Sequence, residues 1–382
     1  MDAGRRLRIA FVADTVEASV AGGVRSARRF VDGLRARHDV TVVAAGATGP
    51  DDLRLPAFVP PFAGRLMRGN GFTFAVPRSR ALAALFRRVD VVHVQFPFWL
   101  GLRAAAVANE VGTPLVSAFH VQPENLLRNV GVHAPRLAAW LNDQLVRRLY
   151  DRSAAVVCPS AFALDQLRAH GLRAHAEVIS NGAPPEFGPS TLERPARHRG
   201  KVLVLAVGRL APEKRLDVTI EGIRRSRNAG RIQLVVTGRG PEESAIRRLA
   251  AALPIPAEIG YVTDGELRRL LATADLLVHA SEYELEGMAV LEALACGTPA
   301  LVARAPGSAA QQFALSPDFL FEAGDPRDLA RRLDRLLETP SALHDARALA
   351  LALAERHPLA DSVRRLEQLY LRVSGERGGA PP

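Results

Sequence analysis

Short apolar runs alternate with amphipathic stretches along most of this chain. Runs such as Val202–Val207 and Leu276–His279 carry apolar residues at nearly every position, and each is followed by a segment with helical spacing of apolar residues. Strands this apolar are typical of parallel sheets that helices cover on both faces. The pattern therefore predicts an α/β protein.

The individual elements follow from the same pattern. In the first half we expect strands at Leu7–Ala13, Val40–Ala45, Val89–Val94, Pro114–Ala118, Ala154–Cys158 and Ala176–Ile179, with helices at Ser26–Arg37, Leu102–Glu110 and Phe162–His170. In the second half we expect strands at Val202–Val207, Ile232–Thr237, Ala257–Ile259, Leu276–His279 and Pro299–Val302. The helices expected between and after them are Arg215–Arg227, Glu242–Ala252, Gly265–Ala272, one after Ser281, Leu329–Glu338 and Ser341–Arg356.

Glycine and proline divide the chain in the stretch EFGPSTLERPARHRG, residues 186–200, which is typical of a linker. The alternating pattern restarts after it, which predicts two doubly wound domains. We expect a first domain at 1–187, a linker at 188–200 and a second domain at 201–357. A C-terminal helix at 358–373 is expected to cross back to the first domain, and 374–382 to be a disordered tail.

Composition narrows the class of protein. Hydrophobic residues make up 48% of the chain, and the two cysteines, Cys158 and Cys296, imply no disulfide framework. No apolar run approaches the roughly 18–20 residues of a membrane span. The apolar stretch Ile9–Ala13 is too short for a signal-peptide core and is predicted to be a strand. A cytoplasmic protein is the resulting expectation.

The net charge of +10 is concentrated in the first half. Residues 1–190 hold 23 arginines against 15 acidic residues, which gives +8, and the remainder holds 27 basic against 25 acidic residues, which gives +2. Such an excess attracts phosphate-bearing partners or an anionic membrane surface. An arginine-rich composition without a function explains it equally well.

Polar and glycine residues follow several strands, where ligands of doubly wound sheets bind. Gly22 and Gly23 open a helix after the first strand, and His120 follows Pro114–Ala118. Paired glycines let backbone N–H groups approach an anion, and an imidazole can bond a ligand hydroxyl. A flexible turn and a structural histidine are the alternatives.

The second half places cations at a strand end. Gly208 leaves room directly after Val202–Val207, and Arg209 and Lys214 follow at the opening of a helix. A guanidinium fork beside an ammonium point charge suits a diphosphate. A salt-paired surface loop is the alternative.

The stretch SEYELEGMAVLEALACGTPA, from Ser281 to Ala300, holds three glutamates. Glu284 is expected in a loop facing a cleft, where it accepts hydrogen bonds from hydroxyls. Gly287, Met288 and Ala289 are expected at a helix start that faces a phosphate. Glu292, inside the helix, is expected to bind a vicinal diol. Glu286 is expected to be a solvated charge at the helix start.

Several functional motifs are missing. No GxGxxG follows the first strand, and Gly238–Pro241 begins such a pattern but reaches Glu243. No GxxxxGK[ST], HExxH or CxxC occurs, so a P-loop ATPase and these metal sites are not predicted. With 5% aromatic residues and no recognition motif, a nucleic-acid-binding protein is disfavoured.

Taken together, the strand-end motifs resemble those of retaining glycosyltransferases of family 4, over roughly residues 7–330. The similar stretches are Gly22-Gly23, Phe119-His120, Ser180-Asn181-Gly182 through Phe187, Gly208-Arg209-Leu210 with Glu213-Lys214, Gly238–Pro241, and Glu292 through Pro299. Glu284 and Glu292 have the family's spacing of seven intervening residues. The resemblance implies the GT-B fold, with two Rossmann-like domains facing across a cleft.

The resemblance also implies roles for these residues. Arg209 and Lys214 would hold the donor diphosphate and stabilise the leaving group, Glu292 would bind the nucleotide ribose, and Glu284 and His120 would contact the sugar. The implied donor-binding set is Gly22, Gly23, Gly208, Arg209, Lys214, Glu284, Gly287, Met288, Ala289 and Glu292. No metal and no cofactor are implied, only a UDP- or GDP-linked sugar as substrate.

Two stretches depart from the family pattern. Glu286 stands where the family has an aromatic or aliphatic residue, and the loop 305–312 lacks the usual paired glycines and glutamate. Because the family's loop at this position sits by the donor, the identity of nucleotide and sugar stays open.

The sequence of the first half gives the only indications of the acceptor. Residues 96–102 and 120–131 are similar to a bacterial branch that includes diacylglycerol glucosyltransferases. Residues 61–88 mix arginines with Phe62, Leu66, Phe72 and Phe74. The resulting hypothesis is a lipid or envelope-precursor acceptor, with peripheral association at the inner face of an anionic membrane. A basic solvated loop is the alternative.

Other functions stay open. An inactive nucleotide-sugar-binding scaffold and a nucleotide-sugar epimerase share the expected fold. A phosphorylase would need a cofactor lysine, and the chain has only Lys201 and Lys214.

Overall fold

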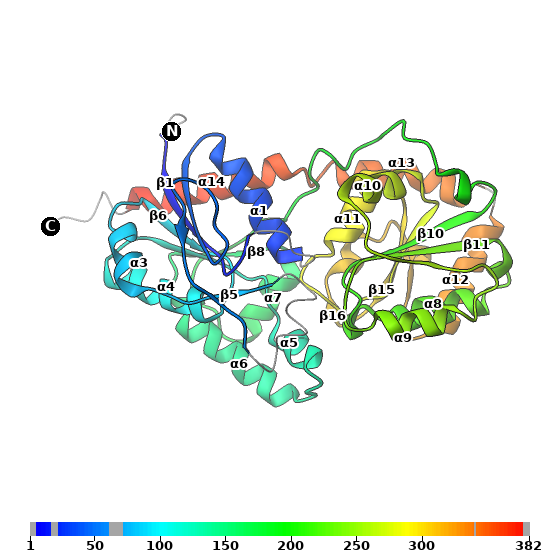
Figure 1. The fold of residues 1–382 in the computed structure, drawn as a ribbon, viewed down its shortest axis with the longest axis horizontal. Coiled ribbons are helices and arrows are strands. Elements are labelled where there is room, and N and C mark those ends of the chain that lie inside the picture. Colours follow the sequence, from blue (N-terminus) through cyan, green and yellow to red (C-terminus); the bar gives the residue numbers. More distant parts are fainter. Residues whose placement is uncertain (1–4, 17–21, 61–71, 340, 377–382) are drawn as a thin grey trace. The chain divides into compact units, whose positions relative to one another are not determined.

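The computed structural model describes residues 5–16, 22–60, 72–339 and 341–376. The chain forms two units, Met1–Asn181 with Ala360–Pro382, and Gly182–Leu359. In each unit a twisted sheet lies between layers of helices (Figure 1). The first expected domain ended at residue 187, but Phe187 is buried in the core of the second unit. Its side chain explains why the boundary lies earlier.

The first unit contains a seven-stranded sheet in which all neighbouring strands are parallel. Its order is β3-β2-β1-β6-β7-β8-β9. The strands are β1 (Arg8–Val12), β2 (Asp39–Ala44), β3 (Leu53–Arg54), β6 (Val91–Val94), β7 (Leu115–Ala118), β8 (Ala155–Cys158) and β9 (Ala176–Val178). A separate antiparallel pair joins β4 (Ala57–Phe58) to β5 (Phe74–Ala75).

Helices link these strands. They are α1 (Gly22–Arg35), α3 (Ser79–Phe86), α4 (Trp99–Glu110), α5 (Pro123–Asn129), α6 (Pro135–Arg148) and α7 (Ala161–Ala169). The expected helix at Ser26–Arg37 begins earlier, at Gly22, so that Gly22 and Gly23 form the first turn of α1.

The second unit contains a six-stranded parallel sheet with the order β12-β11-β10-β13-β15-β17. Its strands are β10 (Val202–Val207), β11 (Ile232–Thr237), β12 (Glu258–Gly260), β13 (Leu276–His279), β15 (Ala300–Arg304) and β17 (Leu320–Glu322). Its helices are α8 (Leu216–Arg225), α9 (Glu243–Ala250), α10 (Asp264–Thr273), α11 (Met288–Ala295), α12 (Pro326–Glu338) and α13 (Ala342–Ala354).

Alternation along β10 shows why this sheet needs helices on both faces. Val204 and Ala206 belong to one buried cluster with residues of α8, α9 and α12, whereas Leu203 and Leu205 belong to another with residues of α10 and α11. Successive side chains of a strand point to opposite faces, so an apolar run supplies both cores. This confirms the predicted α/β class.

The C-terminal helix α14 (Leu359–Glu376) belongs to the first unit. Its Glu367 pairs with Arg37 and lies 3.1 Å from His38 Nε2, and its Arg372 pairs with Glu177 of β9. The expected tail from residue 374 is helical as far as Glu376, and residues 377–382 lie outside the described part of the chain.

Both sheets reverse their strand order at one point. In the first unit β1 lies between β2 and β6, and in the second unit β10 lies between β11 and β13. The chain leaves neighbouring strands in opposite directions there, which opens a crevice at their carboxyl ends. These two switch points, β1/β6 and β10/β13, are followed by the residues that the sequence singles out.

Candidate active site

The loop after β10 carries the two predicted cations of the second unit. Gly208 has φ 144°, a conformation that side-chain-bearing residues rarely adopt. A Cβ built on Gly208 would lie 3.5 Å from Lys214 Cε. Gly208 thus turns the chain out of the strand, and the short 3-10 helix Pro212–Lys214 returns Lys214 alongside it.

A second glycine loop holds the first in place. A Cβ on Gly238 would come within 1.8 Å of the Gly208 carbonyl oxygen, and one on Gly240 within 2.1 Å of the Leu210 carbonyl oxygen. The Leu210 N–H donates to the Arg239 carbonyl at 2.9 Å. These glycines let the two loop backbones pack directly against each other. This packing gives a structural reason for Gly238 and Gly240, which form only the beginning of a GxGxxG motif.

Lys214 and Glu284 meet at the β10/β13 switch point. The Lys214 ammonium donates to Glu284 Oε1, and His279 Nε2 lies 3.1 Å from the same oxygen. Burial opposes the negative charge, but Lys214 and His279 outweigh it and hold the pKa of Glu284 well below its usual range. Glu284 is therefore an ionised acceptor, and its Oε2 receives no hydrogen bond from the described residues.

Arg209 is held by a neighbour on its own loop. Its guanidinium donates to Glu213 Oε1 at 2.5 Å. Glu213 is buried, and its Oε2 has no hydrogen-bond partner among the described residues. A carboxylate withdrawn from water beside an arginine fixes the position of that arginine. The sequence identified Glu213 only as a motif residue.

The loops after β10 and β13 are also joined directly. The Glu282 N–H donates to the Glu213 carbonyl at 2.9 Å, and Arg215 pairs with Glu282 and Asp217. Arg215 has φ 47° and precedes α8. Its left-handed backbone is costly for arginine, and the two carboxylates hold it there.

The Glu284 segment forms a small sheet that was not predicted. β14 (Tyr283–Glu284) pairs with β16 (Gly307–Ser308), and the Ala309 N–H donates to the Glu284 carbonyl at 2.8 Å. The loop 305–312, which departs from the family pattern, thus supports the backbone of Glu284. A Cβ on Gly287, which has φ 107°, would meet Ala310 at 2.8 Å.

The expectation of a solvated Glu286 is wrong. Only 3% of Glu286 is exposed, and its carbonyl accepts a hydrogen bond from Gln312 Nε2 at 3.1 Å. Met288 and Ala289 form the first turn of α11 as expected, and Glu292 lies buried further along the helix.

In the first unit, the predicted glycine pair and histidine lie together. A Cβ on Gly23 would lie 3.6 Å from His120 Cβ and 3.0 Å from the ring of Phe96. Burial, followed by the nearby His93, lowers the pKa of His120 to about 3. His120 is therefore a neutral imidazole at physiological pH, suited to hydrogen bonding with a hydroxyl.

A buried chain of hydrogen bonds leads from α14 to this glycine pair. Tyr370 Oη lies 2.8 Å from His93 Nδ1, His93 Nε2 lies 3.1 Å from Gln95 Oε1, and Gln95 Nε2 donates to the Gly23 carbonyl at 3.2 Å. Since an amide oxygen only accepts, His93 Nε2 carries the proton and Tyr370 donates to Nδ1. Burial lowers the pKa of His93 to about 4, which keeps the ring neutral.

Aromatic rings surround the same switch point. Phe72, Phe74, Phe96 and Phe98 pack edge-on or stacked with ring centroids 5.2–6.1 Å apart. Asp14, after β1, is 1% exposed, and burial raises its pKa to about 7. Sequence reasoning missed Asp14, Gln95 and His279, although each follows or ends a strand and a systematic survey of strand ends would include them.

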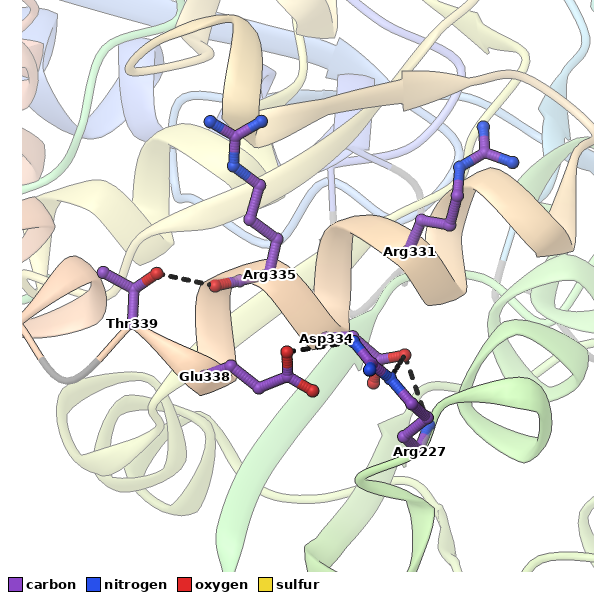
Figure 2. Close-up of a pocket in the computed structure, with 6 residues that line it drawn as sticks. All are labelled: Arg227, Arg331, Asp334, Arg335, Glu338 and Thr339. Atoms are coloured by element: carbon purple, nitrogen blue, oxygen red, sulfur yellow. Dashed lines mark hydrogen bonds and ion pairs between the residues drawn. The ribbon is translucent and has the colours of Figure 1, made fainter.

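One surface pocket lies away from the strand ends (Figure 2). It is lined by Arg227, by Thr339 and by four residues of α12: Arg331, Asp334, Arg335 and Glu338. Arg227 pairs with Asp334 at 3.4 Å and with Glu338 at 2.9 Å. Because Arg227, Arg331 and Arg335 all form ion pairs with carboxylates of the chain, we assign this pocket no ligand.

Among the described residues, no group of three or more histidine, cysteine, aspartate or glutamate side chains is arranged to hold a metal ion. No helix in the same part of the chain has the length and apolar character to cross a bilayer.

Comparison with known proteins identifies the family of the chain. Residues 20–187 match the family model described as Glycosyltransferase Family 4, and residues 191–350 match Glycosyl transferases group 1. A GDP-mannose-dependent alpha-mannosyltransferase of Mycobacterium tuberculosis is 30% identical over 340 residues, covering 85% of this chain and 81% of that protein. The chain belongs to the family 4, group 1 glycosyltransferases.

Two further relatives are informative. A GDP-mannose-dependent alpha-(1-6)-phosphatidylinositol dimannoside mannosyltransferase of M. tuberculosis is 31% identical over 307 residues, covering 74% of this chain and 76% of that protein. The Anabaena protein Alr3699/HepE, solved in complex with UDP and glucose, matches with a TM-score of 0.74 at 17% identity, covering 95% of this chain and 99% of that chain. The predicted GT-B fold is confirmed, and the family assigns the enzyme a nucleotide-sugar donor.

Proposed function

We propose that this glycosyltransferase moves mannose from GDP-mannose to a lipid-type acceptor, with retention of configuration at the anomeric carbon and without a metal. The donor class and the acceptor class follow those of the two M. tuberculosis mannosyltransferases that the chain resembles. The observation that carries the proposal is the charged cluster at the β10/β13 switch point, where Lys214, Glu284 and His279 converge beside Arg209.

The cluster suits a diphosphate leaving group. Arg209 presents a guanidinium that Glu213 has already oriented, and Lys214 retains N–H donors beyond the one that it gives to Glu284. When the bond between the anomeric carbon and the diphosphate oxygen breaks, negative charge grows on that oxygen. Cations positioned beforehand stabilise this charge without reorganisation.

Glu284 suits recognition of the sugar. Its Oε1 is occupied by Lys214 and His279, and its Oε2 is available to accept from a hydroxyl. Its lowered pKa keeps it ionised, and its two cationic or N–H partners make it a poor nucleophile. We assign it to orienting the sugar, while the bond between the anomeric carbon and the acceptor oxygen forms and the acceptor proton passes to the departing diphosphate.

A donor screen followed by product analysis tests the proposal. We expect GDP-mannose to raise the melting temperature more than UDP-glucose, UDP-GlcNAc or UDP-galactose, equally with and without EDTA. Ligand at a hundredfold excess over Kd stabilises by about 2.7 kcal/mol. Product from a phosphatidylinositol-type acceptor should show the donor's anomeric configuration by proton NMR. Inversion, or loss of transfer with EDTA, would contradict those parts of the proposal, and donor binding without turnover would favour a scaffold.

A further inference from the structure

Exposed apolar side chains concentrate on the hairpin formed by α5 and α6, residues 123–148. Eleven large hydrophobic residues of the described chain are exposed, and five of them lie between residues 126 and 140: Leu126, Val130, Val132, Leu137 and Trp140. Trp140 is 53% exposed and Val130 63%. Scattered exposed apolar residues are normal, but a concentration of them on one hairpin indicates an interaction surface.

The hairpin does not use these side chains for its own folding. On α6 the buried residues are Ala138, Asn142 and Val146, spaced four apart, so they form its inner face. Leu137 and Trp140, spaced three apart, project from a different face. Asn142 Nδ2 donates to Glu124 Oε1 of α5 at 2.8 Å and ties the two helices together, which lie side by side in Figure 1.

Positive charge borders this face. Arg136, Arg147 and Arg148 are exposed, and their side chains form no ion pair or hydrogen bond within the part of the chain that the structure describes. The two acidic residues of the hairpin are engaged, Glu124 with Asn142 and Asp143 with His170 Nδ1 at 2.9 Å. Arginine beside tryptophan and aliphatic residues is the composition of a helix that lies at a lipid interface.

The hairpin is continuous with the candidate site. Gln122, which precedes the first turn of α5, lies two residues after His120. By contrast, Phe72 and Phe74 of the basic stretch 61–88 pack their rings against Phe98, and residues 61–71 lie outside the described part. The exposed apolar side chains of the described residues therefore point to the hairpin as a second candidate for a membrane face.

We propose that the α5–α6 hairpin docks on an anionic bilayer, with Trp140 and Leu137 at headgroup depth and the arginines against lipid phosphates. This inference deepens the proposed function because it delivers a lipid acceptor beside His120. Only the role of the docking, which is to reach a lipid acceptor, rests on the proposed function. The docking itself can be measured without a donor and without turnover.

Flotation with vesicles tests the docking. One set is phosphatidylcholine alone, and the other contains one part in three of phosphatidylglycerol. We expect binding to the second set, weakened by salt, and a loss of about tenfold in affinity for Leu137→Gln/Trp140→Gln, because burial of two large apolar groups is removed. Trp99→Gln is the matched control, since Trp99 is 55% exposed on α4 and is the chain's other tryptophan.

Fluorescence locates the contact. In a Trp99→Phe background, the emission of Trp140 should shift to shorter wavelength on the anionic vesicles and be quenched by brominated lipid. Absence of binding, or equal binding by the double variant and the wild type, would overturn the proposal. So would light scattering that shows a dimer dissolved by the double variant. GDP-mannose binding measured on the double variant reports separately on the proposed function.

Discussion

The two switch points occupy equivalent places in their sheets, yet they are built by opposite means. At β10/β13 the side chains are charged, and the partners come from two loops that follow neighbouring strands. At β1/β6 they are neutral, and the chain of hydrogen bonds reaches Tyr370, which is 277 residues from His93 in sequence. The difference indicates two tasks. The β10/β13 switch point can exchange its ion-pair partners for a charged ligand, whereas the β1/β6 switch point holds its backbone in a fixed place.

Charged partners can be shared with a ligand at modest cost, because Lys214 keeps free donors and Glu284 a free oxygen. A buried neutral chain cannot be shared in this way, since each group in it would lose a partner that nothing nearby replaces. The second unit is therefore expected to respond strongly to changes of charge, and the first to loss of single hydrogen bonds.

The largest effect is expected for Lys214→Met. Removing a positioned cation from a leaving-group site lowers the rate of transfer by roughly 100-fold or more. Lys201→Met is the control, because Lys201 lies before the other end of β10 and donates to Gln233 Oε1 at 3.0 Å. Initial rates of mannosyl transfer measure both. Equal rates for the two variants would remove Lys214 from the site.

Glu284→Gln should lower transfer by about 10- to 100-fold, because the amide presents a dipole where the sugar meets a charge. It should also change the dependence of stability on pH. The pKa of Glu284 is lowered from 4.5, so the wild type's advantage in unfolding free energy is full above that pH and shrinks as pH falls below it. Denaturant titrations at pH 7 and pH 4 measure this. If the difference in unfolding free energy between wild type and Glu284→Gln grew as the pH fell, the assigned pairing of Glu284 with Lys214 and His279 would be contradicted.

Tyr370→Phe should lower the free energy of unfolding by about 1–3 kcal/mol, because His93 Nδ1 is left buried without a donor. Tyr150→Phe is the matched control. Tyr150 is fully buried in the same unit, and its hydroxyl has no partner among the described residues, so its loss should cost nothing.

Hydrogen exchange distinguishes positioning from simple loss of stability. Amides of the first turn of α1 should exchange faster in Tyr370→Phe, although Tyr370 lies on a different helix. Faster exchange confined to α14 would show that the hydrogen-bond chain does not hold the glycine pair.

Gly23→Ala should have the smallest effect, a few-fold loss of transfer with stability changed by less than about 1 kcal/mol. The new Cβ would lie 3.0 Å from the Phe96 ring, which must move by a few tenths of an ångström. Phe96→Leu in the same chain should restore part of the activity. Steady-state rates of the wild type, the two single variants and the double variant form a double-mutant cycle. If the losses of activity in the two single variants add up in the double variant, the effect of Gly23→Ala does not pass through Phe96.

The sequence predicted the parts of the fold that repeat a simple rule. The bounds of β10, β11 and β13 agree with the apolar runs, since a strand covered on both faces is apolar throughout. Helices α5 and α6 went unrecognised because their outward apolar residues obscure the helical period. α5 also begins at Pro123 and has only one turn beyond its first.

The candidate site also contains residues that the sequence could indicate and residues that it could not. Gly208, Arg209, Lys214 and Glu284 could be singled out because they lie in the segments that follow β10 and β13 beside the switch point. The burial of Glu286 could not be predicted, because it comes from tertiary packing: its carbonyl accepts a hydrogen bond from Gln312, 26 residues later in the chain. Nor could the link from Tyr370 to Gly23, since no local pattern specifies which buried polar groups meet across the fold.

Calorimetric titration of GDP-mannose into the wild type, Lys214→Met and Lys201→Met, in the presence of EDTA, tests the central claim most directly. We expect saturable one-site binding by the wild type and Lys201→Met, and at least tenfold weaker binding by Lys214→Met. Equal affinity of all three proteins would contradict the claim that the β10/β13 switch point binds the donor diphosphate.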